Sequence, residues 1–300
     1  MSGAGSRLSL RPSSSTSLLL VVVITVSLLL SGAPGLSGQE PPPPQWQNTA
    51  ELTFLLTGGN SQASTLGLRN NLRRTSQAGQ LRVTASALRT DATRIERFAV
   101  ETPDGDFEVR EDEDTERTAE RYSAGIRYDR NLTSAFFSYG SVNWDRNTFA
   151  GFDSRTILSG GAGAQRASDR AETKLGVGLT YTFQNDVTPD PDRSDNFVGL
   201  RATLDHSRQL TTGTSFELAW VVDANAQEWD DVRGTLEQAV TAALSDRLSL
   251  KTSLQLQVDN DPPVQSLRLE TADGQDTGER VLAPLRRVDR NLSVALVVTL

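Results

Sequence analysis

Residues 248–259 read LSLKTSLQLQVD, a stretch in which the side-chain character alternates from one residue to the next. The leucines, Thr252 and Val258 take one parity, while the serines, Lys251, the glutamines and Asp259 take the other. Because successive side chains of a strand point to opposite faces, this segment has one apolar and one polar face. Such strands of about ten residues, separated by turns, are typical of a transmembrane β-barrel, although a soluble sandwich shows the same alternation.

The same pattern recurs along the chain and ends with Leu292, Val294, Leu296, Val298 and Leu300 on one parity. The predicted strands are 46–56, 64–74, 80–90, 118–128, 132–144, 155–165, 172–183, 196–206, 215–226, 232–244, 248–259 and 288–300. Segment 132–144 has apolar residues on both parities, so its outward face stays unassigned. An even strand number fits bacterial single-chain barrels and places both ends of the barrel on the periplasmic side.

The predicted connections alternate in length, which favours a spanning barrel over a sandwich. The short class is 76–79, 129–131, 167–170, 207–214 and 245–247, and the long class includes 91–117, 145–154, 185–195 and 260–287. Connection 57–63 departs from this alternation because it is short. Aromatic residues near strand ends fit the girdles of outer-membrane barrels, or equally the caps of a soluble core: Trp46, Tyr128, Trp144, Phe183 and Trp229.

The N-terminus has the pattern of a cleavable Sec-type signal peptide, residues 1–38. Arg7 and Arg11 precede an apolar run at 18–30, which small residues and proline follow. The run is shorter than the roughly 20 residues of a spanning helix, and a retained anchor is the alternative. Residues 39–45 form a proline-rich linker, and the barrel is expected over 46–300.

The composition excludes several classes of protein. The chain has no cysteine, so neither a disulfide scaffold nor a lipoprotein anchor is expected. Its net charge is −8, and loss of Arg7 and Arg11 with the signal makes it −8 − 2 = −10. An acidic surface argues against nucleic acid as a partner.

The polar parity of the strands predicts a charged lumen. The basic candidates are Arg69, Arg73, Arg82, Arg127, Arg155, Lys174, Arg201, Arg233 and Lys251; the acidic ones are Glu51, Glu172, Asp205, Glu217, Asp223, Glu237 and Asp259. Charges in a confined lumen are tolerated when they are paired. Two interpretations remain open: a ladder of ion pairs that closes the interior, and a narrow selective conduit.

Segment 101–120 carries ten acidic residues and two arginines, a net of −8. We expect a solvated, mobile loop, with divalent cations as possible partners. Asp112 and Asp114 lack the glycine and distal glutamate of an EF-hand loop. His206 is the single histidine, lies on the lipid-facing parity, and has no acidic partner at a recognisable spacing. The run from Gly160 to Gly163 lacks the Lys-Ser/Thr of a phosphate-binding loop.

Three stretches together resemble the bacterial salt-induced outer membrane protein family, a domain of unknown function. They are AEL at 50–52 with TGGNS at 57–61, the segment from YDRNLT at 128–133 to Tyr139 and Gly140, and WDRN at 144–147 followed by Phe149, Gly151, Asp153 and Arg155. The resemblance spans nearly the whole mature chain. It implies an outer-membrane barrel and transfers no catalytic residue.

The sequence therefore predicts an all-β protein, an antiparallel transmembrane β-barrel of about 12 strands behind a cleavable signal peptide. We expect a monomer in the bacterial outer membrane, with membrane lipid and the barrel assembly machinery as partners, no cofactor and no enzymatic activity. Its role is structural, linked to envelope stress, or that of a narrow conduit, with low or absent conductance. The alternative is a soluble periplasmic or surface β-sandwich that acts as a binding module.

Overall fold

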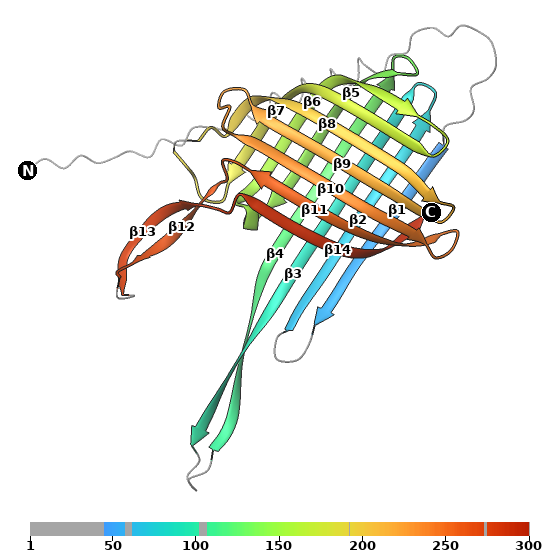
Figure 1. The fold of residues 1–300 in the computed structure, drawn as a ribbon. Helices are drawn as coiled ribbons and strands as arrows, with labels where there is room; N and C mark the ends of the chain where they lie inside the picture. Colours follow the sequence, from blue (N-terminus) through green and yellow to red (C-terminus); the bar gives the residue numbers. More distant parts are fainter. Residues whose placement is uncertain (1–44, 58–61, 102–106, 192, 273–274, 300) are drawn as a thin grey trace, which may run out of the picture. The chain divides into compact units, whose positions relative to one another are not determined.

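Twelve antiparallel strands close into a barrel in the computed structural model, which describes residues 45–57, 62–101, 107–191, 193–272 and 275–299 (Figure 1). The predicted signal peptide and most of the linker lie outside the described residues. The barrel strands are β1 (Gln45–Thr57), β2 (Gln62–Ser76), β3 (Gly79–Glu101), β4 (Phe107–Asn131), β5 (Phe136–Asn147), β6 (Phe152–Ala167), β7 (Ala171–Asp186), β8 (Asn196–Thr211), β9 (Thr214–Asn225), β10 (Val232–Ala243), β11 (Leu248–Asp259) and β14 (Val288–Thr299).

The predicted fold class is confirmed, and the sandwich alternative is wrong. Each strand pairs with its neighbour along the chain, and β14 pairs with both β11 and β1 to close the ring. Each of the twelve predicted segments contains a barrel strand, although residues 132–135 of the predicted strand 132–144 form a turn. Tight turns at 77–78, 132–135, 168–170, 212–213 and 244–247 join the strands at one end. We call this end the turn side and the opposite end the loop side. Among the described residues, no helix is long and apolar enough to cross a membrane.

The outer face of the barrel is apolar, as the alternation predicts. Leu292, Val294 and Leu296 of β14 are exposed, whereas Ala295 and Val297 between and beside them are buried. On β7, Val177 is 67% exposed while Gly176 on the opposite parity is buried. Apolar side chains exposed on one parity of the strands are the pattern expected of a barrel surface that contacts lipid.

The closing seam between β1 and β14 is short. Among the described residues, which end at Thr299, four residue pairs join the two strands, from Thr49 opposite Thr299 to Leu52 opposite Leu296. Beyond Leu52, β1 continues to Thr57 in register with β2 alone. The loop-side half of the seam therefore leaves backbone hydrogen-bonding groups without a ladder partner on the neighbouring strand, a costly arrangement in lipid.

Strands β3 and β4 extend past the barrel as a two-stranded ribbon, seen in Figure 1 as the long green arm. β3 pairs with β2 only as far as Thr93, and β4 pairs with β5 only from Arg121 onward. Beyond these points the two strands pair with each other alone. The segment 91–117, predicted to be a long connection between strands, is therefore paired strand wherever the structure describes it.

The acidic segment 101–120 is mostly strand rather than the mobile loop expected from its charge. Its register places Asp114 opposite Arg94 and Glu111 opposite Arg97. Within the described part of the chain, no group of three acidic or histidine side chains is arranged to hold a metal ion.

At the base of the ribbon, Arg89 Nε donates a hydrogen bond of 2.7 Å to Asp91 Oδ2. This hydrogen bond and the charge of Arg89, with Arg117 in addition, hold the pKa of the Asp91 carboxyl below its usual value. Arg117 also lies 2.7 Å from Glu120. These charges mark the point where β3 and β4 leave the barrel wall.

The connection 260–287, expected as a loop, contains a separate hairpin of β12 (Val264–Glu270) and β13 (Asp276–Pro284). Its base is joined by a hydrogen bond of 2.9 Å from Leu285 N to Pro263 O. Both residues pack on Gly151, which follows the short 3-10 helix η1 (Thr148–Ala150) and has φ 87°. A Cβ at Gly151 would lie 2.6 Å from each of them. Glycine is required here both for the left-handed backbone and for the close approach.

Candidate functional site: the barrel lumen

The lumen is filled on one side by aromatic rings lying over glycines. Phe137 and Tyr139 of β5 are 0% and 6% exposed, which assigns the inward face of this strand. A Cβ at Gly163 would lie 2.5 Å from the Phe137 ring, and one at Gly178 would lie 2.5 Å from Tyr139 Oη. Gly163 of β6 and Gly178 of β7 thus make room for the rings, as does Gly161 of β6, where a Cβ would lie 2.9 Å from the Tyr139 ring.

The predicted lumen charges all fall on one parity of the register, the same parity as the buried Phe137 and Tyr139. Several of them contact side chains on strands that are not neighbours in the sheet. Such contacts can form only across the interior of a closed barrel. The structure groups the charges into a central belt, a loop-side network and a turn-side cavity.

The central belt consists of Arg69, Arg121, Glu237, Gln255 and Gln257. Arg69 Nη1 of β2 lies 2.9 Å from Glu237 Oε1 of β10, four places away around the ring. Arg121 Nη1 of β4 donates to the side-chain oxygens of Gln255 and Gln257 of β11, both at 3.3 Å. These contacts run from one wall of the barrel to another and obstruct the lumen midway.

Arg121 is absent from the sequence-based set of lumen charges, although a signal for it exists. It shares the parity of Arg127, six positions further along the same strand. Asp129, which is 4% exposed, is also missing from that set. It accepts a hydrogen bond of 2.7 Å from Arg127 Nε and lies 3.6 Å from Lys174 Nζ. Asp129 lies in the predicted connection 129–131, so the alternation of apolar and polar residues did not assign it to a face.

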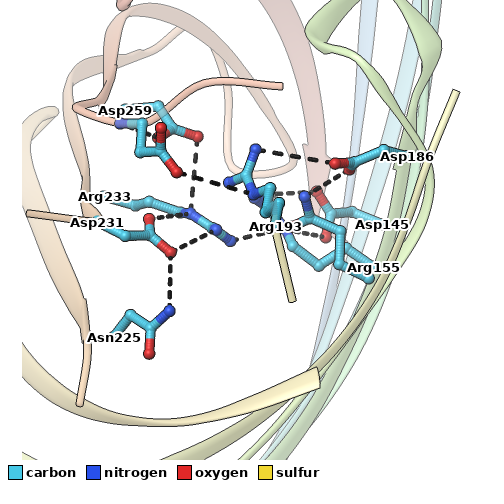
Figure 2. A network of polar contacts seen from close by, with 10 residues as sticks. Asp145, Arg155, Asp186, Arg193, Asn225, Asp231, Arg233 and Asp259 are labelled. Atoms are coloured by element: carbon cyan, nitrogen blue, oxygen red, sulfur yellow. Dashed lines mark hydrogen bonds and ion pairs between the residues drawn. The ribbon is translucent and has the colours of Figure 1, made fainter. Parts of the chain in front are cut away.

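The loop-side network closes the opposite end with alternating charges, shown in Figure 2. Its members come from six strands and two connections: Asp145, Arg155, Asp186, Arg193, Asn225, Asp231, Arg233 and Asp259. Arg233 makes two bonds of 3.0 Å to the Asp231 carboxylate and lies 3.6 Å from Asp259. Arg155 makes two bonds to Asp145, at 3.0 and 3.3 Å. Paired in this way, buried guanidinium groups are tolerated in a confined interior.

Arg193 belongs to this network although it lies in the connection between β7 and β8. Its side chain is 8% exposed, with Nη1 3.8 Å from Asp186 Oδ2 and Nε 4.0 Å from Asp261 Oδ2. Neither Nη1 nor Nη2 has a hydrogen-bond partner. Nothing in the sequence around Arg193 indicates that this loop residue enters the lumen.

Two polar cavities lie along the lumen. The turn-side cavity has a volume of about 390 Å³ and is lined by Arg69, Asn71, Arg73, Arg82, Glu172, Lys174, Asp205, Glu217 and Glu237, among others. The loop-side cavity has a volume of about 300 Å³ and is lined by Phe149, Phe152, Arg155, Arg233, Gln257, Pro263 and Leu285, among others. Glu237 lines the first and Gln257 the second, so the central belt lies between them.

Other predicted lumen residues form pairs within the barrel wall. Arg201 makes a two-bond contact with Asp223, at 2.7 and 2.8 Å. Lys251 Nζ donates a hydrogen bond of 2.9 Å to Glu51 Oε1, across the intervening strand β14. His206 lies on the outward parity, with Nδ1 2.8 Å from Thr173 Oγ1 of the neighbouring strand.

Residues 50–272 match the family described as "Protein of unknown function, DUF481". The "Uncharacterized protein YdiY" of Escherichia coli K12 is 24% identical over 152 residues. That match covers 49% of this chain and only 56% of the relative, which is little more than half of its length.

Solved barrels of low identity also align. An "Anion-selective porin from Comamonas acidovorans" is 9% identical, with 86% of this chain and 100% of that chain covered and a TM-score of 0.36. The "Beta Domain of the Bordetella Autotransporter Brka" is 13% identical, with 85% and 97% covered and a TM-score of 0.36.

Proposed function

Since the chain belongs to the DUF481 family of proteins of unknown function, we propose its role from the barrel itself. It is an integral protein of the bacterial outer membrane that acts as a narrow conduit for small charged solutes and not as a general diffusion porin. The predicted Sec-type signal peptide and the apolar outer band support this location. Its immediate partners are then membrane lipid and the barrel assembly machinery, with the protein as a monomer and without enzymatic activity.

The observation that supports the conduit is the central belt between two polar cavities. General porins of 16–18 strands leave an aqueous channel, whereas side chains fill eight-stranded barrels. This barrel of twelve strands holds cavities of about 390 and 300 Å³ that the contacts of Arg69 and Arg121 separate. The belt is built from long, hydrogen-bonded side chains that can change rotamer, unlike the packed rings of Phe137 and Tyr139.

The conduit is tested by current measurements on purified protein in planar bilayers. We expect the wild-type protein to show small or no currents, because the belt obstructs the lumen. Arg121→Ala removes the bridge to Gln255 and Gln257 without leaving a charge unpaired, and we expect it to raise the conductance. Arg280→Ala is the matched control, because this residue lies in the β12–β13 hairpin, where its Nε donates to Ser266 Oγ.

A purely structural role in the envelope is the second candidate. The glycine-backed rings of β5 favour it, because they fill part of the lumen with buried aromatic side chains. The structural role is supported, and the conduit overturned, if neither the wild-type protein nor Arg121→Ala passes current. Heat-modifiable gel migration must show in the same experiment that both proteins are folded. Large, weakly selective wild-type channels would overturn both readings.

A further inference from the structure

Three buried polar atoms in the wall of the turn-side cavity have no hydrogen-bond partner. They are Asn71 Oδ1, Arg73 Nε and Arg82 Nε. Native proteins satisfy the large majority of such atoms, so each unsatisfied one requires an explanation. All three lie on β2 and β3, and Arg73 is directly opposite Arg82 in the register. This wall of the cavity therefore carries three unsatisfied hydrogen-bonding atoms on two adjacent strands.

The two guanidinium groups on this wall also lack a direct ion-pair partner. Among the described residues, neither Arg73 nor Arg82 has a carboxylate within 4.0 Å. Other cations lining the cavity do: Lys251 lies 2.9 Å from Glu51, and Lys174 lies 3.2 Å from Glu172. Two like charges held side by side repel each other and attract an anion between them.

The opposite wall of the cavity carries unpaired negative charge. Asp205 of β8 and Glu217 of β9 line the same cavity, and neither forms an ion pair in the described part of the chain. In the ring order, β8 and β9 lie six places from β2 and β3, on the far side of the twelve-stranded barrel. Two free cations thus face two free carboxylates across a cavity of about 390 Å³.

We propose that the turn-side cavity is a binding site for a short zwitterionic solute of dipeptide size. Its carboxylate lies between Arg73 and Arg82, and its ammonium group points toward Asp205 and Glu217. The planar guanidinium fork suits a carboxylate, which accepts two hydrogen bonds from it. A simple anion meets repulsion from the acidic wall, and a simple cation meets repulsion from the arginines, so the pair of walls selects for molecules that carry both charges.

This site rests on the proposed function in that its ligand would be the solute of the conduit. The test is isothermal titration calorimetry on the full-length, detergent-purified barrel, with alanyl-alanine as the probe. N-acetyl-alanyl-alanine keeps only the carboxylate, and alanyl-alanine amide keeps only the ammonium group. We expect alanyl-alanine to bind at least about tenfold more tightly than either blocked form, a difference of ~1.4 kcal/mol.

Matched variants separate the two ends of the ligand. Arg82→Gln should weaken alanyl-alanine and the acetylated form and leave the amide unchanged. Glu217→Gln should weaken alanyl-alanine and the amide and leave the acetylated form unchanged, while Arg280→Gln in the β12–β13 hairpin should alter none. Equal binding of the three probes, no binding of alanyl-alanine, or variants that affect all probes alike would overturn the assignment.

The calorimetry needs no transport, so the two proposals can fail separately. A barrel that binds alanyl-alanine but remains silent in bilayers, even as Arg121→Ala, overturns the conduit and supports the site. A barrel that Arg121→Ala opens but that binds no zwitterion supports the conduit and overturns the site.

Discussion

Phe137 is the fully buried aromatic side chain of the lumen, and its truncation should be costly. The ring is 0% exposed and lies over Gly163 and Gly176, where a Cβ would approach it to 2.5 and 3.9 Å. No side chain at either glycine can move into the space that Phe137→Ala would leave, and the hydrogen-bonded strands hold the wall in place. The full cavity cost therefore applies, and we expect a loss of about 3–5 kcal/mol in the free energy of unfolding.

The neighbouring residue supplies the control. Phe136 is 57% exposed on the outer face, where lipid can fill the space left by Phe136→Ala. Without a cavity, we expect a loss of about 1 kcal/mol or less. Urea titration of each variant folded into vesicles, followed by tryptophan fluorescence, gives the midpoint and the slope of unfolding. Equal losses for the two variants would refute both the inward assignment of Phe137 and the cavity reasoning.

Two further predictions concern the outer face and the glycines. Leu254→Arg should impair assembly, because arginine at the lipid midplane of a barrel costs roughly 2–4 kcal/mol. Ser253→Arg, on the inward parity, should be tolerated better. Equal yields of heat-modifiable protein for the two variants would contradict the assignment of the inward and outward faces. Gly178→Ala should lower the midpoint of urea unfolding, because the added Cβ would lie 2.5 Å from both Tyr139 Oη and Gly160 O. Gly160→Ala, with nothing nearer than 3.8 Å, should leave that midpoint unchanged, and a larger effect at Gly160 would contradict this packing.

The sequence by itself determined the barrel and its inside and outside. Alternation has a period of two, so a face can be assigned to Lys251 or Leu254 from local pattern alone, before any partner strand is known. The twelve strands and the tight turns were predicted for the same reason. The ribbon of β3 and β4 was missed, because its charged sequence shows no apolar face and its pairing depends on the register of Arg94 with Asp114.

Only the tertiary structure decided which inward residues meet. Closure of the ring brings Arg69 to Glu237 across 168 positions of sequence, and Arg121 to Gln257 across 136. Local alternation cannot fix such pairs, because they depend on the strand order, the stagger and the length of each side chain. Local alternation likewise cannot show that Arg193, a loop residue, extends its side chain into the lumen. Nor can it show that Arg73 and Arg82 have no carboxylate within ion-pair distance. Alternation thus fixes which face a side chain takes, but contact across a lumen is a property of the closed barrel.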